Sequence, residues 1–239
     1  MFWHMDLNHL LFVALPMLAL SMIAQFWLKS TYAKYSQINN AKGITGREAA
    51  YVVLRQAGIN DVEIEQVSGF LSDHYSPGEK KLRLSPENYN GTSIAAVGVA
   101  AHEAGHAMQD AQHYPLMAIR NIAVPMASIG SSFGYVAIVL GLFMTRNPHN
   151  IVTLIGLGLI ACVAFFQLIN LPVEIDASRR ALQVLPGSGI LNVEETKGAQ
   201  VMLTAAAMTY VAATIAALWE VIYWCIRLGL IGGGGRRRD

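Results

Sequence analysis

Four long apolar stretches constrain this chain more than any other feature of its sequence. They run over residues 10–28, 122–144, 151–171 and 201 to about 219. Each approaches or exceeds the roughly 20 residues that a helix needs to cross the hydrocarbon core of a bilayer. Charged residues make up only 14% of the chain, against about 25% in a typical soluble domain. The sequence therefore predicts a mainly α, polytopic membrane protein with about four transmembrane helices.

The first stretch resembles a signal peptide in position only. The leader "MFWHMDLN" contains no Lys or Arg, the apolar run is long, and no small-x-small cleavage site follows it. These features indicate a retained membrane anchor rather than a cleaved signal. In the second stretch, Gly130 and Gly134 have GxxxG spacing, which predicts close approach of a neighbouring helix. The short connection 145–150 predicts that the second and third stretches form an antiparallel hairpin.

The fourth stretch continues into an amphipathic end, "EVIYWCIRLGLI". Trp219, Tyr223 and Trp224 are typical of an aromatic belt at the membrane interface. Glu220 is therefore expected to be hydrated at the membrane edge. The net charge of +1 gives no basic face of the kind that binds nucleic acid, so no nucleic-acid partner is expected.

The polar stretch 29–91 carries the signals of a small α+β domain. "TGRE", starting at Thr45, is a capping box that opens a helix, and Gly58 can close it. Residues 61–67 alternate like a strand, and residues 70–85 read as a hairpin that turns at Pro77 and Gly78. We expect short antiparallel strands here. The strand Lys80 to Ser85 is expected at a sheet edge, either free to pair with an extended peptide or as an ordinary edge strand.

The stretch "GVAAHEAGHAMQD", residues 98–110, carries the chemistry. On a helix, His102 and His106 share one face about 6 Å apart along the axis, so both can hold one metal ion. Glu103 is rotated away and can reach a water instead, which is the arrangement of an HExxH zinc site. The surrounding residues provide no other polar face, and burying these groups without a partner would be costly.

A catalytic zinc needs a third protein ligand. A metzincin would have a glycine at 109 and a histidine at 112, but the chain has Gln109 and Gln112, and His113 is one position off. No LDG-like motif of an intramembrane site-two-type protease occurs. The remaining source is a glutamate from a separate helix.

"LPVEIDASRRA" offers Glu174 as this third ligand, with Asp176 as a competitor. Two predicted spans separate His106 from Glu174, so both emerge on the same side of the membrane. This favours Glu174, although a simple ion pair of Glu174 with the arginines at 179 and 180 remains an alternative. For stabilising a tetrahedral intermediate, the sequence offers four unranked donors: His74, His113, Tyr114 and Arg179.

The segments "LRLSPENYNGTSIAAVGVAAHEAGHAMQ" and "NLPVEIDASRRA" resemble the YugP-like family of neutral zinc metallopeptidases of bacterial membranes. More distantly the chain is similar to HtpX-like and CAAX-prenyl membrane gluzincins. The resemblance implies a multi-pass protein of the bacterial plasma (inner) membrane with one zinc per chain. It also implies that His102, His106 and Glu174 bind the zinc and that Glu103 is the catalytic base.

One position departs from the distant relatives. They have an aspartate four residues after the ligand glutamate, where it supports the site, and this chain has Ser178. Either Ser178 gives a weaker hydrogen bond there, or Asp176 takes the role.

These observations predict a membrane-embedded zinc metalloendopeptidase that hydrolyses peptide or protein substrates. The alternative is a non-catalytic zinc-binding membrane scaffold or regulator, but a scaffold has no need of Glu103. A zinc-dependent channel or transporter is disfavoured because the spans contain almost no ionisable residues. The expected segments are an anchor (1–28), a peptidase segment with HExxH (29–118), a transmembrane hairpin (119–172), a second peptidase segment (173–200), and a fourth span with a basic tail (201–239).

Basic residues near span ends favour the cytoplasmic side. Seven such residues lie on the side of the HEAGH motif and five on the other. On the motif side they are Lys29, Lys34, Lys42, Arg120, Arg179, Arg180 and Lys197; on the other side they are Arg146, Arg227 and Arg236 to Arg238. We therefore expect a cytoplasmic active site.

Overall fold

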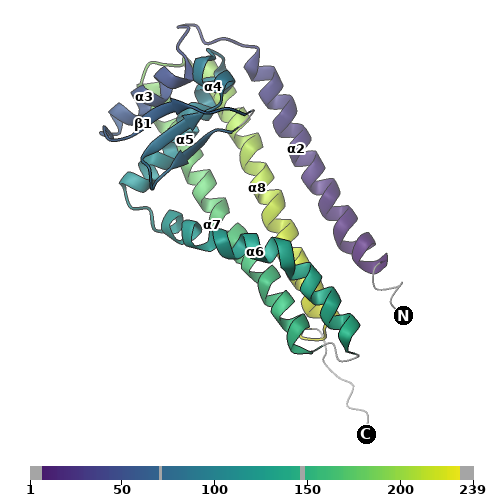
Figure 1. Ribbon diagram of the computed structural model, residues 1–239. Helices are drawn as coiled ribbons and strands as arrows, with labels where there is room; N and C mark the ends of the chain where they lie inside the picture. The colour runs from purple at the N-terminus through teal and green to yellow at the C-terminus, as the bar shows by residue number, and fades with distance from the viewer. Residues whose placement is uncertain (1–6, 70–71, 146–148, 232–239) are drawn as a thin grey trace. The chain divides into compact units, whose positions relative to one another are not determined.

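A computed structural model describes residues 7–69, 72–145 and 149–231 (Figure 1). The chain is mainly helical, with one small sheet. The helices are η1 (Leu10–Ala14, a π-helix), α2 (Leu15–Ser36), α3 (Gly46–Gln56), α4 (Pro86–Asn90), α5 (Ile94–Ala111), α6 (Pro115–Met144), α7 (Ile151–Gly187) and α8 (Val193–Arg227). The strands are β1 (Glu63–Gln66), β2 (His74–Ser76) and β3 (Lys81–Leu84).

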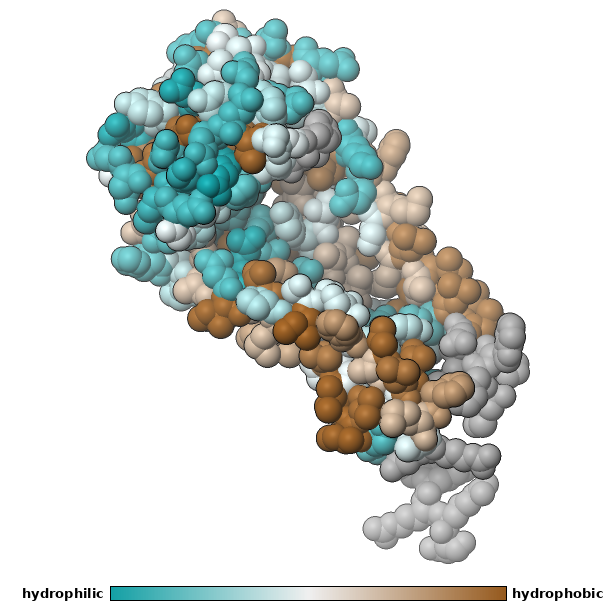
Figure 2. All heavy atoms as spheres, viewed as in Figure 1, coloured by the Kyte–Doolittle hydropathy of each residue, from teal (hydrophilic) through white to brown (hydrophobic). Residues whose placement is uncertain are grey.

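Within these described ranges, four helical segments are long and apolar enough to cross a membrane: Leu7–Ser36, Pro115–Met144, Ile151–Gly187 and Val193–Arg227. The four predicted spans are thus confirmed, and all four helical segments extend beyond the predicted apolar runs. The chain divides into two compact units, one formed by residues 1–23, 119–171 and 210–239 and the other by residues 24–118 and 172–209. In Figure 2 the visible surface of the first unit is largely hydrophobic, as a lipid-facing surface requires.

In the first unit, α6 and α7 pack closely through glycines. A Cβ on Gly134 would come within 2.8 Å of the Ile160 side chain, and one on Gly156 would come within 2.6 Å of the Ile138 backbone nitrogen. Contacts between the late part of α6 and the early part of α7 confirm the predicted antiparallel hairpin. The predicted role of the GxxxG pair is also confirmed, because Gly130 lies against Leu159. Part of the predicted connection, residues 146–148, lies outside the described residues.

The end of α8 in this unit differs from the sequence expectation. Glu220 is not simply hydrated: its carboxylate lies 2.9 Å from the His9 imidazole nitrogen and accepts a hydrogen bond from the Trp224 indole at 2.8 Å. Trp224 is buried rather than part of an interface belt. The Trp219 indole donates a hydrogen bond to the Phe12 carbonyl at 2.9 Å. Phe12 lies within the π-helix η1, in which i→i+5 hydrogen bonds replace the i→i+4 bonds of an α-helix.

The second unit confirms the predicted local structure. The Thr45 side chain accepts from the Glu48 backbone N–H, and the Glu48 carboxylate accepts from the Thr45 N–H, so the capping box opens α3. Gly58, at a positive φ of 75°, follows the end of this helix, as the left-handed conformation favours glycine. Strands β2 and β3 form the predicted antiparallel hairpin.

The sheet corrects two expectations. Its order is β1-β3-β2, and β1 pairs with β3 in parallel, so the strands are not all antiparallel. Strand β3 lies in the centre, with both edges occupied, so the prediction that Lys80 to Ser85 forms an edge for peptide binding was wrong. The free edges of this sheet belong to β1 and β2.

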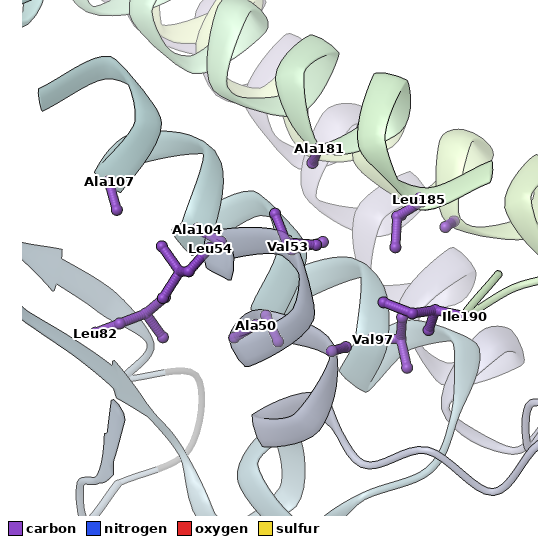
Figure 3. Packing of buried hydrophobic residues seen from close by; sticks show 14 of the residues in the cluster. Ala50, Val53, Leu54, Leu82, Val97, Ala104, Ala107, Ala181, Leu185 and Ile190 are labelled. Carbon is purple, nitrogen blue, oxygen red and sulfur yellow. The ribbon is translucent and has the colours of Figure 1, made fainter. Parts of the chain in front are cut away.

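The core of the second unit surrounds α5. Side chains from α3, β3, α5 and α7 point towards one another in Figure 3, including Val53, Leu82, Ala104 and Leu185, all of them fully buried. Helix α5 is rich in alanine and glycine, and a Cβ on Gly98 would meet the Met202 side chain at 2.9 Å. Small residues thus let α5 lie at the centre of the unit, enclosed by its neighbours.

Candidate metal centre

Helix α5 begins with a regular cap. Ser93 is the N-cap residue, and its hydroxyl accepts a hydrogen bond from the Ala96 N–H at 3.1 Å. Most of the helix is buried, including two of the ionisable residues of the HEAGH motif: Glu103 is 8% exposed and His106 6%. Glu103 and His106 are therefore buried in the folded chain and need polar partners inside the protein.

His102 and His106 lie one above the other on α5, with ring centroids 4.8 Å apart. Glu174, which is 3% exposed, comes from α7. One of its carboxylate oxygens lies 3.4 Å from Nε2 of His102 and 3.6 Å from Nε2 of His106. One potential ligand atom from each residue lies within 4.8 Å of the others, so the group could hold a metal ion.

The distances from Nε2 of the two histidines to the Glu174 carboxylate oxygen fit a shared cation better than direct hydrogen bonds. An N–H···O hydrogen bond is typically about 2.7–3.2 Å long. Two donors bound to one zinc at about 2.1 Å in a tetrahedral arrangement lie roughly 3.4 Å apart. Two imidazoles and one carboxylate are also a donor set that zinc takes at catalytic sites, where the fourth position holds water. The residues present therefore fit the zinc that the sequence predicts.

Each histidine is held through its other ring nitrogen. Nδ1 of His102 lies 3.0 Å from the Ser178 hydroxyl, and Nδ1 of His106 lies 3.0 Å from the Gln109 side-chain oxygen. Such contacts orient imidazole ligands in metal sites. The sequence left open whether Ser178 or Asp176 supports the site. In the structure Ser178 contacts His102 directly. Asp176 is linked to His106 through Gln109, whose amide donates to Asp176 at 2.9 Å.

Asp176 is not a member of the group formed by His102, His106 and Glu174. Its carboxylate forms an ion pair with Arg180, so this arginine bonds Asp176 rather than Glu174. The same guanidinium donates to Gln112 and lies over the Tyr114 ring, 5.6 Å from its centroid. Glu174, not Asp176, is therefore the acid that the fold brings to the two histidines.

Glu103 lies beside this group in a desolvated position. Burial raises the pKa of Glu103 from 4.5 to about 7, and the negative charges of Glu174 and Asp73 act in the same direction. The electrostatic influence of His102 and His74 acts in the opposite direction. A carboxyl group with this pKa exchanges protons near neutral pH.

The four candidate donors for an intermediate are spread over the unit. His74 is exposed on β2 and acts electrostatically on Glu103. His113 is exposed just past the end of α5, Tyr114 lies beneath Arg180, and Arg179 is exposed on α7. Of these four, His74 lies on β2, a strand that packs against α5.

Gln109 is the residue that the sequence analysis missed. From the sequence, Gln109 is notable only because it stands where a metzincin would have a glycine. Its position three residues after His106 on a helix is a weak signal, because residues at i and i+3 are neighbours on a helical surface. The partners of its amide lie on α7, more than sixty residues away, and no local pattern identifies them.

Comparisons with known proteins agree with this arrangement. A family model described as "Putative neutral zinc metallopeptidase" matches residues 10–229, a range that contains His102, His106 and Glu174. The chain is 40% identical over 214 residues to a protein named "Putative membrane protease YugP" from Bacillus subtilis (strain 168), covering 89% of this chain and 93% of that protein. No solved structure matches the chain.

Proposed function

The chain belongs to the neutral zinc metallopeptidase family, and on that premise we propose that it is a membrane-embedded zinc metalloendopeptidase. The observation that carries the proposal is the meeting of Glu174 with His102 and His106, at distances that suit a shared zinc. Family membership supports a protease role and a membrane location. The ligand set, the base and the substrate class are our proposals.

In the proposed site, His102, His106 and Glu174 hold one zinc, the two imidazoles through Nε2. Zinc, when bound, supplies a Lewis acid that lowers the pKa of a coordinated water and polarises the scissile carbonyl. Glu103 accepts the proton of the attacking water on its carboxylate. It then returns a proton to the leaving amine, which is the double role of a general acid–base group.

The substrate would be an extended peptide. We assign this peptide to the outer edge of β2, because β2 packs against α5, the helix that carries the HEAGH motif. Pairing of a peptide with β2 would use backbone hydrogen bonds and leave the choice of side chains open. His74 is then the best placed of the candidate donors to a developing oxyanion, ahead of His113, Tyr114 and Arg179.

The bilayer is the other expected partner. We propose that the protein is a multi-pass protein of the plasma membrane, with the zinc site on the cytoplasmic side. The support is the excess of basic residues flanking the spans on the side of the HEAGH motif.

Metal removal tests the proposed activity against the alternative of a zinc-binding scaffold. The purified full-length protein in detergent is incubated with an unstructured protein substrate before chelation, after chelation, and after zinc is returned. We expect cleavage to disappear on chelation and to return with about one zinc per chain. Cleavage that persists in metal-free protein, or its absence in zinc-loaded protein towards a panel of unstructured substrates, would contradict the proposal.

A further inference from the structure

The side chain of Gln109 is completely buried, with an exposed fraction of 0%. Its amide lies between the two helices that carry the candidate ligands. The nitrogen donates to the Val173 carbonyl at 2.8 Å and to an Asp176 carboxylate oxygen at 2.9 Å. The oxygen faces Nδ1 of His106 at 3.0 Å. Both amide hydrogens and the amide oxygen are thus engaged.

The two α7 partners determine which way the amide points. The Val173 carbonyl can only accept hydrogen bonds, and the Asp176 carboxylate, paired with Arg180, is likewise an acceptor. A flipped amide would set its oxygen against both of these oxygens. The nitrogen of Gln109 therefore faces α7, and its oxygen faces His106.

This orientation determines the tautomer of His106. An amide oxygen can only accept, so Nδ1 of His106 must carry the hydrogen that it shares with Gln109. In the neutral ring, the lone pair is then on Nε2, the nitrogen that lies 3.6 Å from Glu174. A metal ion in the proposed site needs this lone pair.

We propose that Gln109 is a positioning residue, which holds His106 in the tautomer and ring orientation that bind the metal. This inference rests on the proposed zinc site and adds a residue that is not itself a ligand. Val173 immediately precedes Glu174, and Asp176 follows it by two positions. The turn of α7 that carries Glu174 therefore also binds the Gln109 amide, which in turn orients His106.

His102 is held differently. Its partner, the Ser178 hydroxyl at 3.0 Å, can donate or accept a hydrogen bond, so it does not impose one tautomer. Loss of Gln109 should consequently weaken metal binding more than loss of Ser178.

The test is the zinc affinity of the purified full-length protein, measured in detergent by competition with a chromogenic chelator. Gln109→Met fills the same space but neither accepts from His106 nor donates to α7. Gln109→Glu keeps an acceptor for His106, but it replaces the donor to α7 by an oxygen that faces the Val173 carbonyl and the Asp176 carboxylate. Gln112→Met is the matched control, because the Gln112 side chain is exposed and bonds Arg180 rather than a histidine.

We expect Gln109→Met to weaken zinc binding by about 10–100-fold, the usual effect of losing an outer-shell partner. Gln109→Glu should lose less affinity than Gln109→Met, because it keeps the acceptor for His106, and Gln112→Met should stay close to wild type. The visible spectrum of the cobalt-substituted protein should change more in Gln109→Met than in Gln109→Glu. If the methionine variant does not fold, Gln109→Asn gives the same comparison, because it withdraws the amide from His106 by one methylene.

Equal losses of affinity in Gln109→Met and Gln109→Glu would show that the acceptor for His106 does not support zinc binding, and would overturn the inference. Wild-type affinity in Gln109→Met would overturn it as well. The wild-type protein separates this failure from a failure of the proposed function. If it binds no zinc at His102, His106 and Glu174, the proposed site itself is wrong.

Discussion

Gly105 on α5 lies directly against the backbone of Ala177 on α7. A Cβ built on Gly105 would be 3.2 Å from the Cα of Ala177 and would overlap its carbonyl oxygen. Gly105 immediately precedes His106 on α5, and Ala177 follows Glu174 by three positions on α7. The close approach of the two backbones therefore determines whether the third ligand reaches the histidines.

Gly105→Ala should separate the two helices and weaken the site. The obstacle is backbone rather than a flexible side chain, so the cost should be about 1–3 kcal/mol or more of the free energy of unfolding. We expect a lower melting temperature and reduced zinc content. Gly158→Ala on α7 is the control, since a Cβ there meets nothing within 4 Å. Wild-type zinc content and stability in Gly105→Ala would show that the helices are not held this closely.

The third ligand can be identified by comparing two acids on the same turn of α7. Glu174→Ala removes the carboxylate that meets both histidines, so elemental analysis should show the loss of most of the zinc. Asp176→Ala should retain it at saturating zinc, because Gln109 still donates to Val173. The reverse pattern would assign the ligand to Asp176.

The sequence identifies features that depend on local periodicity. The capping box at Thr45, the hairpin around Pro77 and the pairing of His102 with His106 on one face all follow from residues close together in the chain. The parallel pairing of β1 with β3 does not, because it depends on how two strands meet in space.

Contacts between distant segments could not be predicted from the sequence, because they too depend on how the segments meet in space. His9 and Glu220 are separated by 211 positions, and no local signal pairs them. The support of His106 by Gln109 depends on the register of α5 against α7. That register is determined by tertiary packing around small residues such as Gly105.

The pH dependence of stability should reveal the burial of Glu103. In the zinc-free protein, folding raises the pKa of Glu103 from 4.5 to about 7. The protonated form is therefore favoured in the fold, and the stability that it contributes is complete below pH 4.5 and is lost as the pH rises through about 7.

Glu103→Gln imitates the protonated form at every pH. Relative to wild type, this metal-free variant should gain on the order of 3 kcal/mol in free energy of unfolding between pH 4.5 and pH 8. Melting temperatures of both proteins at pH 5 and pH 8 give the comparison. A constant difference between them would show that Glu103 is not desolvated.

The membrane orientation can be tested by cysteine labelling. In a background lacking Cys162 and Cys225, a cysteine replacing His149 should react with a membrane-impermeant thiol reagent in intact cells. One replacing Glu79, which is exposed beside β3, should react only after permeabilisation. Labelling of intact cells at 79 but not at 149 would place the zinc site outside the cytoplasm.

The most direct test of the account is the rate of peptide cleavage per bound zinc in Glu103→Gln and in wild type. The substitution keeps the shape of the side chain and leaves His102, His106 and Glu174 in place, but it removes the carboxylate that accepts the proton. We predict that the variant holds about one zinc per chain and that its cleavage rate falls by at least 10²–10⁴-fold, the usual contribution of a general base. Equal rates per bound zinc in the two proteins would contradict the account.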